Sequence, residues 1–119
     1  MEERRKKKRI LSSVFIRFSF EDAPDKYNVA FTEDISLDGV KMLSESALKV
    51  DDNIDLNIDI PNNPDMTVAE GNVRWVGSKT IDELTGKSAY LAGVELTYMD
   101  RQDKDFLEKF LNVRAPAEI

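Results

Sequence analysis

An alternation of apolar and polar residues with a period of two runs from residue 14 to residue 99 of this 119-residue chain. Successive side chains of a β-strand point to opposite faces, so this period predicts half-buried strands. The clearest case is NIDLNIDI (53–60), in which every second residue is Ile or Leu. Turn-forming sequences such as EDAPDK, LDG and PNNPD separate the alternating segments. The pattern therefore predicts a mainly β chain with six short antiparallel strands.

The apolar positions of each segment also predict which face is buried. The expected inward positions are Val14, Ile16, Phe18 and Phe20 in the first segment, Tyr27, Val29, Phe31 and Ile35 in the second, and Tyr90, Ala92, Val94, Leu96 and Tyr98 in the last. Val68 and Val73 lie an odd number of positions apart, which predicts a change of face and a β-bulge at Gly71. Trp75, in the same segment, is expected in the core.

Only the end of the chain has helical spacing. In DRQDKDFLEKFLNV (100–113), the four apolar residues of FLEKFL form one face of a helix. Asp100 stands where an N-cap is needed, and Pro116 follows the expected C-terminus. Six short strands followed by one helix predict an all-β fold, a small antiparallel barrel in one domain. We expect the helix to cover an open end or edge of the barrel.

Residue types that are absent exclude several functions. The chain has no His and no Cys, so the common general base, the thiolate nucleophile and disulfides are missing, and no enzyme is expected. DDNIDL resembles the start of a calcium loop. However, Leu56 and Asn62 stand where the motif needs Gly and Glu, so no metal site is expected.

No targeting or membrane segment is evident either. No window approaches the roughly 18 apolar residues of a transmembrane helix. LSSVFIRFSF (11–20) is interrupted by Ser and Arg, so it does not read as a signal peptide. We therefore expect a cytoplasmic protein with no membrane span.

Six consecutive cations, RRKKKR (4–9), stand at the start of an otherwise acidic chain. Of 17 basic and 23 acidic residues, 11 basic and 21 acidic follow Arg9, so the body carries a net charge near −10. This asymmetry indicates an anionic partner for the N-terminal end. On composition alone, the block reads as a tail with generic attraction for nucleic acid or anionic lipid. The acidic body argues against an extended polyanion as the partner, and strong salt dependence would mark such binding.

A second polar cluster lies in EDISLDGV (33–40). Asp34 and Ser36 are two positions apart, so their side chains are expected on one side of the strand, opposite its apolar residues. Gly39 follows where the chain must turn, a position suited to positive φ or to close approach by a ligand. Taken alone, these three residues describe an ordinary hairpin turn.

Together the two segments resemble the PilZ domain family, whose signature is RxxxR before the first barrel strand and [D/N]xSxxG at the second hairpin. RKKKR (5–9) matches the first motif and DISLDG (34–39) matches the second, about 25 residues further on. GNVRWVG, AGVEL and the apolar C-terminal helix are also similar to this family. The resemblance covers roughly residues 4–112. It divides the chain into a basic N-terminal segment (1–13), a barrel with its helix (14–112) and a tail (113–119).

The resemblance implies binding of the bacterial second messenger cyclic dimeric GMP (c-di-GMP). Arginine pairs bidentately with phosphate oxygens or with guanine O6 and N7, and it stacks on bases, so Arg5 and Arg9 are expected to clamp the ligand. The Asp34 carboxylate can accept hydrogen bonds from guanine N1–H and the amino group. The Ser36 hydroxyl can serve base or phosphate, and Gly39 leaves room for a ring.

Three further residues are candidates. Arg4 directly precedes RxxxR, and an arginine there implies, in this family, a self-stacked ligand dimer, so two ligands per protomer are predicted. Lys41 and Arg74 can reach the ligand, although each also reads as a solvated strand residue.

The implied role is a receptor that acts as a stand-alone adaptor or as a domain of a larger protein. Ligand binding is expected to order the N-terminal segment and change the surface shown to a downstream protein partner, which the sequence does not identify. Two alternatives stay open. One is a PilZ-like docking module that does not bind the nucleotide, and the other is binding of nucleic acid or anionic membrane by the basic tail.

Overall fold

The computed structural model describes residues 9–10, 13–61, 63–81 and 86–114. Its elements are β1 (Arg9–Ile10), β2 (Phe15–Phe20), β3 (Asn28–Ser36), β4 (Gly39–Ser44), β5 (Asn53–Ile58), β6 (Thr67–Ile81), β7 (Ser88–Tyr98) and α1 (Arg101–Arg114). This order confirms a mainly β chain that ends in one helix.

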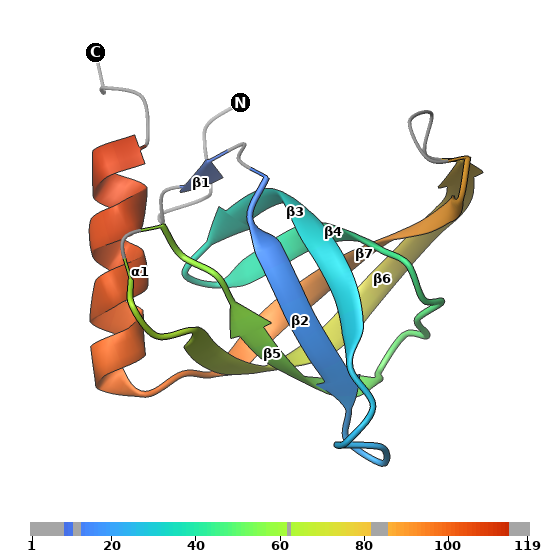
Figure 1. Ribbon diagram of the computed structural model, residues 1–119, viewed down its shortest axis with the longest axis horizontal. Helices are drawn as coiled ribbons and strands as arrows, with labels where there is room; N and C mark the ends of the chain where they lie inside the picture. Colours follow the sequence, from blue (N-terminus) through green and yellow to red (C-terminus); the bar gives the residue numbers. More distant parts are fainter. Residues whose placement is uncertain (1–8, 11–12, 62, 82–85, 115–119) are drawn as a thin grey trace.

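Strands β2 to β7 form a closed antiparallel barrel (Figure 1). Around the barrel the order is β3, β2, β5, β6, β7 and β4, and the additional pairing of β3 with β4 closes the ring. The predicted six-stranded barrel is therefore confirmed. The two-residue β1 is an addition that pairs with the far end of β3.

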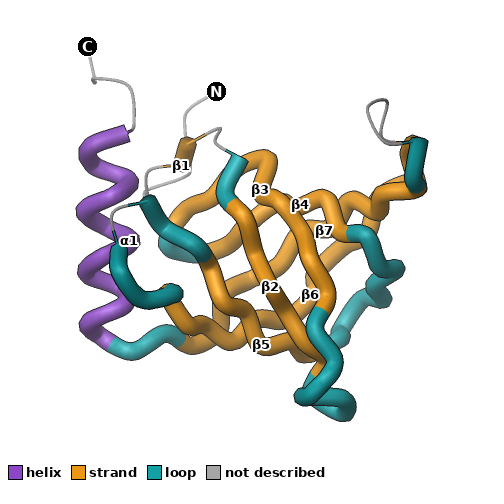
Figure 2. Tube along the Cα trace, in the orientation of Figure 1, coloured by secondary structure: helices purple, strands orange, loops and turns teal. Residues whose placement is uncertain are grey.

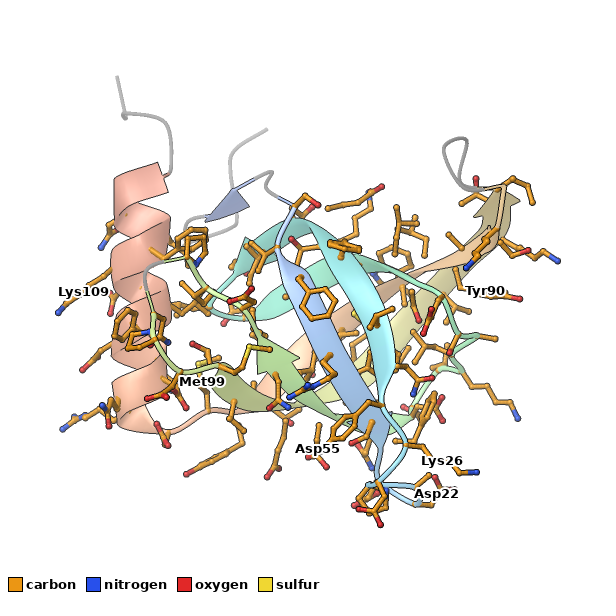
Figure 3. All side chains as sticks on the ribbon, in the orientation of Figure 1. Asp22, Lys26, Asp55, Tyr90, Met99 and Lys109 are labelled. Atoms are coloured by element: carbon orange, nitrogen blue, oxygen red, sulfur yellow. The ribbon has the colours of Figure 1, made fainter. Side chains whose placement is uncertain are left out.

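Apolar side chains at alternate positions fill the barrel. Ile54, Leu56 and Ile58 of β5 are 2%, 0% and 0% exposed, while Asp55 between them is exposed and lies on the outer surface (Figure 3). On β2, Ile16 and Phe18 are fully buried. The predicted inward faces of these two strands are thus confirmed.

Strand β3 presents the face opposite to the predicted one. Ala30 is the Cα partner of Ile16, so the inward face of β2 requires Ala30 to point inward too. Phe31 is consequently on the outside, 49% exposed, and packs edge-on against Phe15 with ring centroids 5.5 Å apart. Val29, also expected inside, is only half-buried. Tyr27 precedes the strand.

Thr32, a polar residue of β3, therefore points into the barrel opposite Met42. Thr32 is 3% exposed, and its Oγ1 accepts a hydrogen bond from the Val14 backbone N–H at 2.9 Å. A register shift between Thr32 and Asp34 then changes the alternation, so that Asp34, Ile35 and Ser36 are all buried. Ile35 is the one apolar residue of this segment whose predicted burial is confirmed.

The predicted change of face at Gly71 does not occur. Thr67, Ala69, Gly71 and Val73 are all buried in one unbroken alternation, and Val68 is 53% exposed. A Cβ at Gly71 would lie 2.6 Å from Val94 Cγ1, so the glycine is required by close packing.

A bulge does exist beside Gly71, but the extra residue is in β7. Glu70 pairs with Tyr98 and Gly71 with Leu96, which leaves Thr97 as the inserted residue. Tyr98 is consequently 59% exposed. The prediction of an inward Tyr98 is wrong, whereas those for Ala92 and Val94 are confirmed.

Helix α1 covers one end of the barrel, opposite the end from which the β6–β7 hairpin projects (Figure 2). Leu107 and Leu111 are 0% and 2% exposed, and Phe110 is 8% exposed. Met99, in the connection from β7, is also buried, whereas Lys109 points away from the barrel (Figure 3). The apolar face predicted from helical spacing is confirmed.

Asp100 is the N-cap of this helix, as predicted. Its Oδ1 accepts a hydrogen bond from the Asp103 N–H at 3.0 Å, and its carbonyl accepts one from the Lys104 N–H at 2.9 Å. Pro116 lies outside the described residues. No helix in the described part of the chain is long and apolar enough to cross a membrane.

Candidate ligand-binding site

Strand β1 brings the two sequence motifs together. Arg9 is the Cα partner of Ser36, and Ile10 is the Cα partner of Ile35. The last arginine of RKKKR therefore lies on the strand next to the serine of DISLDG, as Figure 1 shows for β1 and β3. The structure describes the backbone of Arg9, and Arg4 and Arg5 lie outside the described residues.

Ser36 organises the turn between β3 and β4. Its Oγ accepts hydrogen bonds from the backbone N–H of Asp38 at 3.2 Å and of Gly39 at 3.3 Å. Its hydroxyl also lies 3.4 Å from the Gly39 carbonyl, to which it donates. With 2% of its surface exposed, Ser36 here shapes the hairpin, a structural role that serine performs in many turns.

Gly39 is required by the backbone of the neighbouring strand. A Cβ at this position would lie 2.7 Å from the Val94 carbonyl oxygen, closer than real Cβ contacts come. Among the described glycines only Gly86 has a positive φ, 74°. Positive φ, one of the two reasons predicted for this glycine, is therefore not the reason. The group that approaches it here is the backbone of β7, and close approach by a ligand stays a prediction.

A shallow pocket of about 220 Å³ lies on the outer face of the barrel next to Gly39. Its other lining residues are Asp38, Val40, Lys41, Arg74, Trp75, Gly93, Val94 and Glu95. The pocket thus joins the end of the signature to strands β6 and β7. Lys41 and Arg74, the two additional candidates, both line it.

Each of these cations is paired with a carboxylate. Lys41 Nζ lies 3.6 Å from Glu33 Oε1, and Arg74 Nε lies 3.6 Å from Glu95 Oε1. Arg74 Nη1 also donates to Asn72 Oδ1 at 3.4 Å. All four charged side chains are between 39% and 60% exposed, so solvent screens these pairs and they contribute little to stability.

Trp75 forms part of the pocket and is not in the core, contrary to prediction. Its indole lies directly against Gly93, because a Cβ there would be 2.0 Å from the indole Nε1. The ring is 43% exposed. A register shift between Val73 and Trp75 turns it to the outside. The signal in the sequence was Gly93, since a glycine inside a strand often marks close approach by another group.

Asp34 lies beside a second pocket, of about 470 Å³, which it lines together with Ser13, Phe31, Glu33 and Lys41, among others. Asp34 is 7% exposed and is the Cα partner of Lys41. Because Lys41 lines both pockets, the two hollows are neighbours on the same side of β4. The described residues contain no group of three or more acidic side chains able to hold a metal ion.

This combination of a closed six-stranded barrel, a capping helix and two signature motifs joined by β1 defines a known class of small domain. The family model described as "PilZ domain" matches residues 3–112. The chain therefore belongs to the PilZ domain family, as its motifs predicted.

Solved structures with the same fold include several PilZ proteins. The inhibitor of motility MotI/DgrA of Bacillus subtilis has a TM-score of 0.72 at 16% identity, over 95% of this chain and 51% of that one. The PilZ domain of Escherichia coli YcgR with c-di-GMP has a TM-score of 0.69 at 15% identity, over 93% and 91%. The K. pneumonia MrkH–c-di-GMP complex has a TM-score of 0.67 at 15% identity, over 94% and 52%.

At these identities the similarity shows the fold alone. The chain spans about half the length of MotI/DgrA and of MrkH. A comparison with curated proteins found no match.

Proposed function

We propose that this chain is a receptor domain for c-di-GMP, acting by binding and not by catalysis. The observation that carries the proposal is the β1–β3 pairing, which sets Arg9 of RxxxR beside Ser36 of DxSxxG. Membership of the PilZ family supports it. Two proteins of the same fold, YcgR and MrkH, are described in complex with this nucleotide.

In this proposal Arg5 and Arg9 clamp the ligand. A guanidinium makes charge-assisted, bidentate bonds to phosphate oxygens, and its plane stacks on a base. The β1–β3 pairing places Arg9 directly beside the β3–β4 turn, so a ligand held by Arg9 lies over that turn. Lys6, Lys7 and Lys8 raise the local positive potential and so the rate of association.

Asp34, Ser36 and Gly39 form the platform. The Asp34 carboxylate accepts hydrogen bonds from guanine N1–H and the amino group, whereas it would repel an anionic phosphate. Ser36 contributes chiefly through the turn that it holds, since its hydroxyl already bonds the backbone of residues 38 and 39. Gly39 lets β4 lie close to β7 and contributes no side chain to the neighbouring pocket.

The pocket next to Gly39 (the outer pocket) offers additional contacts to the same ligand. Trp75 presents a half-exposed aromatic ring on which a base can stack, an interaction worth about 1–3 kcal/mol per base. Lys41 can exchange its carboxylate partner for a phosphate. With Arg4 next to the clamp, we propose that two stacked ligands bind each protomer.

Binding would be read out through the N-terminal segment. The N-terminal segment (1–13) already pairs with the barrel (14–112) through Arg9 and Ile10. Ordering of the rest of this segment by the ligand changes the surface that a downstream protein meets, which is how an adaptor in a bacterial cytoplasm would signal. A tail at 113–119 completes this division of the chain.

Calorimetric titration of c-di-GMP into the purified chain tests the proposal. GTP and a single-stranded oligodeoxynucleotide serve as controls. We expect saturable heat with c-di-GMP alone. Equal binding of the oligonucleotide with steep salt dependence would support the basic-tail alternative. If c-di-GMP gave no binding heat with a folded chain, the protein-docking alternative would be favoured.

A further inference from the structure

Arg74 and Glu95 form an exposed donor–acceptor pair at the outer pocket. Arg74 is the extra residue where the β6–β7 register shifts between Val73 and Trp75, and Glu95 is on β7. Arg74 Nε and Glu95 Oε1 are 3.6 Å apart, and the two side chains are 60% and 51% exposed. Their polar ends are therefore accessible to a ligand.

The pair lies directly beside the PilZ signature. Glu95 is the Cα partner of Gly39, the last residue of DxSxxG, and both line the pocket of about 220 Å³. The pocket has two glycines, Gly39 and Gly93, in its lining, and the Trp75 ring covers Gly93. A planar ring that enters this pocket meets the glycine backbone and the face of Trp75. The Arg74–Glu95 pair then lies at the edge of the ring.

Arg74 is oriented by a second set of bonds. Its Nη1 donates to Asn72 Oδ1 at 3.4 Å. Asn72 Nδ2 in turn donates to Asn53 Oδ1 at 2.9 Å and to the Asp51 carbonyl at 3.3 Å. A guanidinium carries five N–H donors, so these contacts hold it in place and use part of its capacity.

We propose that Arg74 and Glu95 together read one guanine of the ligand. Guanine carries the acceptors N7 and O6 next to the donors N1–H and N2–H₂, so its edge needs a bidentate donor beside a carboxylate. Arg74 supplies the first and Glu95 the second, already side by side. This inference rests on the proposed binding of c-di-GMP and assigns to the outer pocket the selection of guanine.

Adenine would be mismatched at both partners. Its N6 amino group is a donor where guanine has O6 and would face the donors of Arg74. Its unprotonated N1 would face the Glu95 carboxylate, which can only accept. The pair therefore favours c-di-GMP over c-di-AMP, which has the same phosphate–sugar ring.

The test compares Glu95→Gln with the wild-type chain in calorimetric titrations of c-di-GMP and c-di-AMP. Glutamine keeps the shape but loses the charge and one acceptor. We expect at least a tenfold loss of affinity for c-di-GMP and a smaller ratio between the two nucleotides. Glu108→Gln, at an exposed position on α1, is the matched control and should leave both unchanged. Arg74→Lys, which keeps the charge but loses the planar fork, should also weaken c-di-GMP binding.

The outcomes separate this inference from the function on which it rests. Wild-type binding with unchanged or tighter binding by Glu95→Gln would show that Glu95 is only an acidic neighbour of the site, and would overturn the inference alone. Failure of the wild-type chain to bind c-di-GMP would overturn both.

Discussion

Arg9 and Ser36 are paired residues of two adjacent antiparallel strands, although 26 positions separate them in the chain. The pairing joins the two halves of the PilZ signature without any contact between their side chains being required. Because Arg9 is the first residue of β1, the pairing with the end of β3 also fixes the position at which the first motif ends. The spacing of the two motifs thus reflects the register of β1 on β3, in addition to the chemistry of their side chains.

Because β3 presents the face opposite to the predicted one, substitution of two phenylalanines should lower the free energy of unfolding by very different amounts. Phe18 is 0% exposed, whereas Phe31 is 49% exposed and contacts Phe15 on the outside. We expect Phe18→Ala to lower the free energy of unfolding by about 3–5 kcal/mol, and Phe31→Ala by about 1 kcal/mol, since an exposed aromatic pair contributes about that much. Urea unfolding measures both. Equal losses would contradict the assignment of Phe31 to the outer surface.

Trp75→Ala should reduce affinity with little effect on folding. The half-exposed ring offers stacking worth about 1–3 kcal/mol per base, so affinity should fall roughly tenfold to a hundredfold. Calorimetry with c-di-GMP measures the loss, and the melting temperature checks the fold. Tyr27→Ala removes another exposed aromatic ring, 58% exposed, and should bind normally. If Trp75→Ala bound as tightly as Tyr27→Ala, the outer pocket would not be part of the site.

The presence of Arg4 directly before RxxxR predicts that two ligands bind each chain. If it supports a stacked ligand dimer, Arg4→Ala should reduce the stoichiometry from two c-di-GMP per chain to one and leave the first binding event in place. Calorimetric stoichiometry, checked by sedimentation of the complex, gives the count. Saturation of the wild-type chain at one ligand would contradict this prediction and leave the clamp by Arg5 and Arg9 unaffected.

The sequence predicted the barrel because burial and alternation coincide on most strands. NIDLNIDI has Ile or Leu at every inward position and Asn or Asp between them, so its face could not be misread. The capping of α1 by Asp100 follows from local chemistry in the same way. These features depend on residues close together in the chain.

The predictions that were wrong depended on partners distant in the chain. The face of β3 follows from its pairing with β2, where Ile16 sets Ala30 inward, and not from its own apolar residues. The exposure of Trp75 follows from a register shift between β6 and β7. The pocket at Gly39 likewise exists because β4, β6 and β7 meet there, and no short motif contains it.

The most direct test of the receptor assignment is calorimetric titration of c-di-GMP into Arg9→Ala beside Arg101→Ala. Arg101 is an exposed arginine at the start of α1, so its removal changes the net charge equally but touches neither motif. Loss of charge-assisted bonds worth about 1.5–3 kcal/mol predicts at least tenfold weaker binding by Arg9→Ala and normal binding by Arg101→Ala. Equal affinity of the two variants would show that the Arg9 side chain has no role in binding, and would contradict the account.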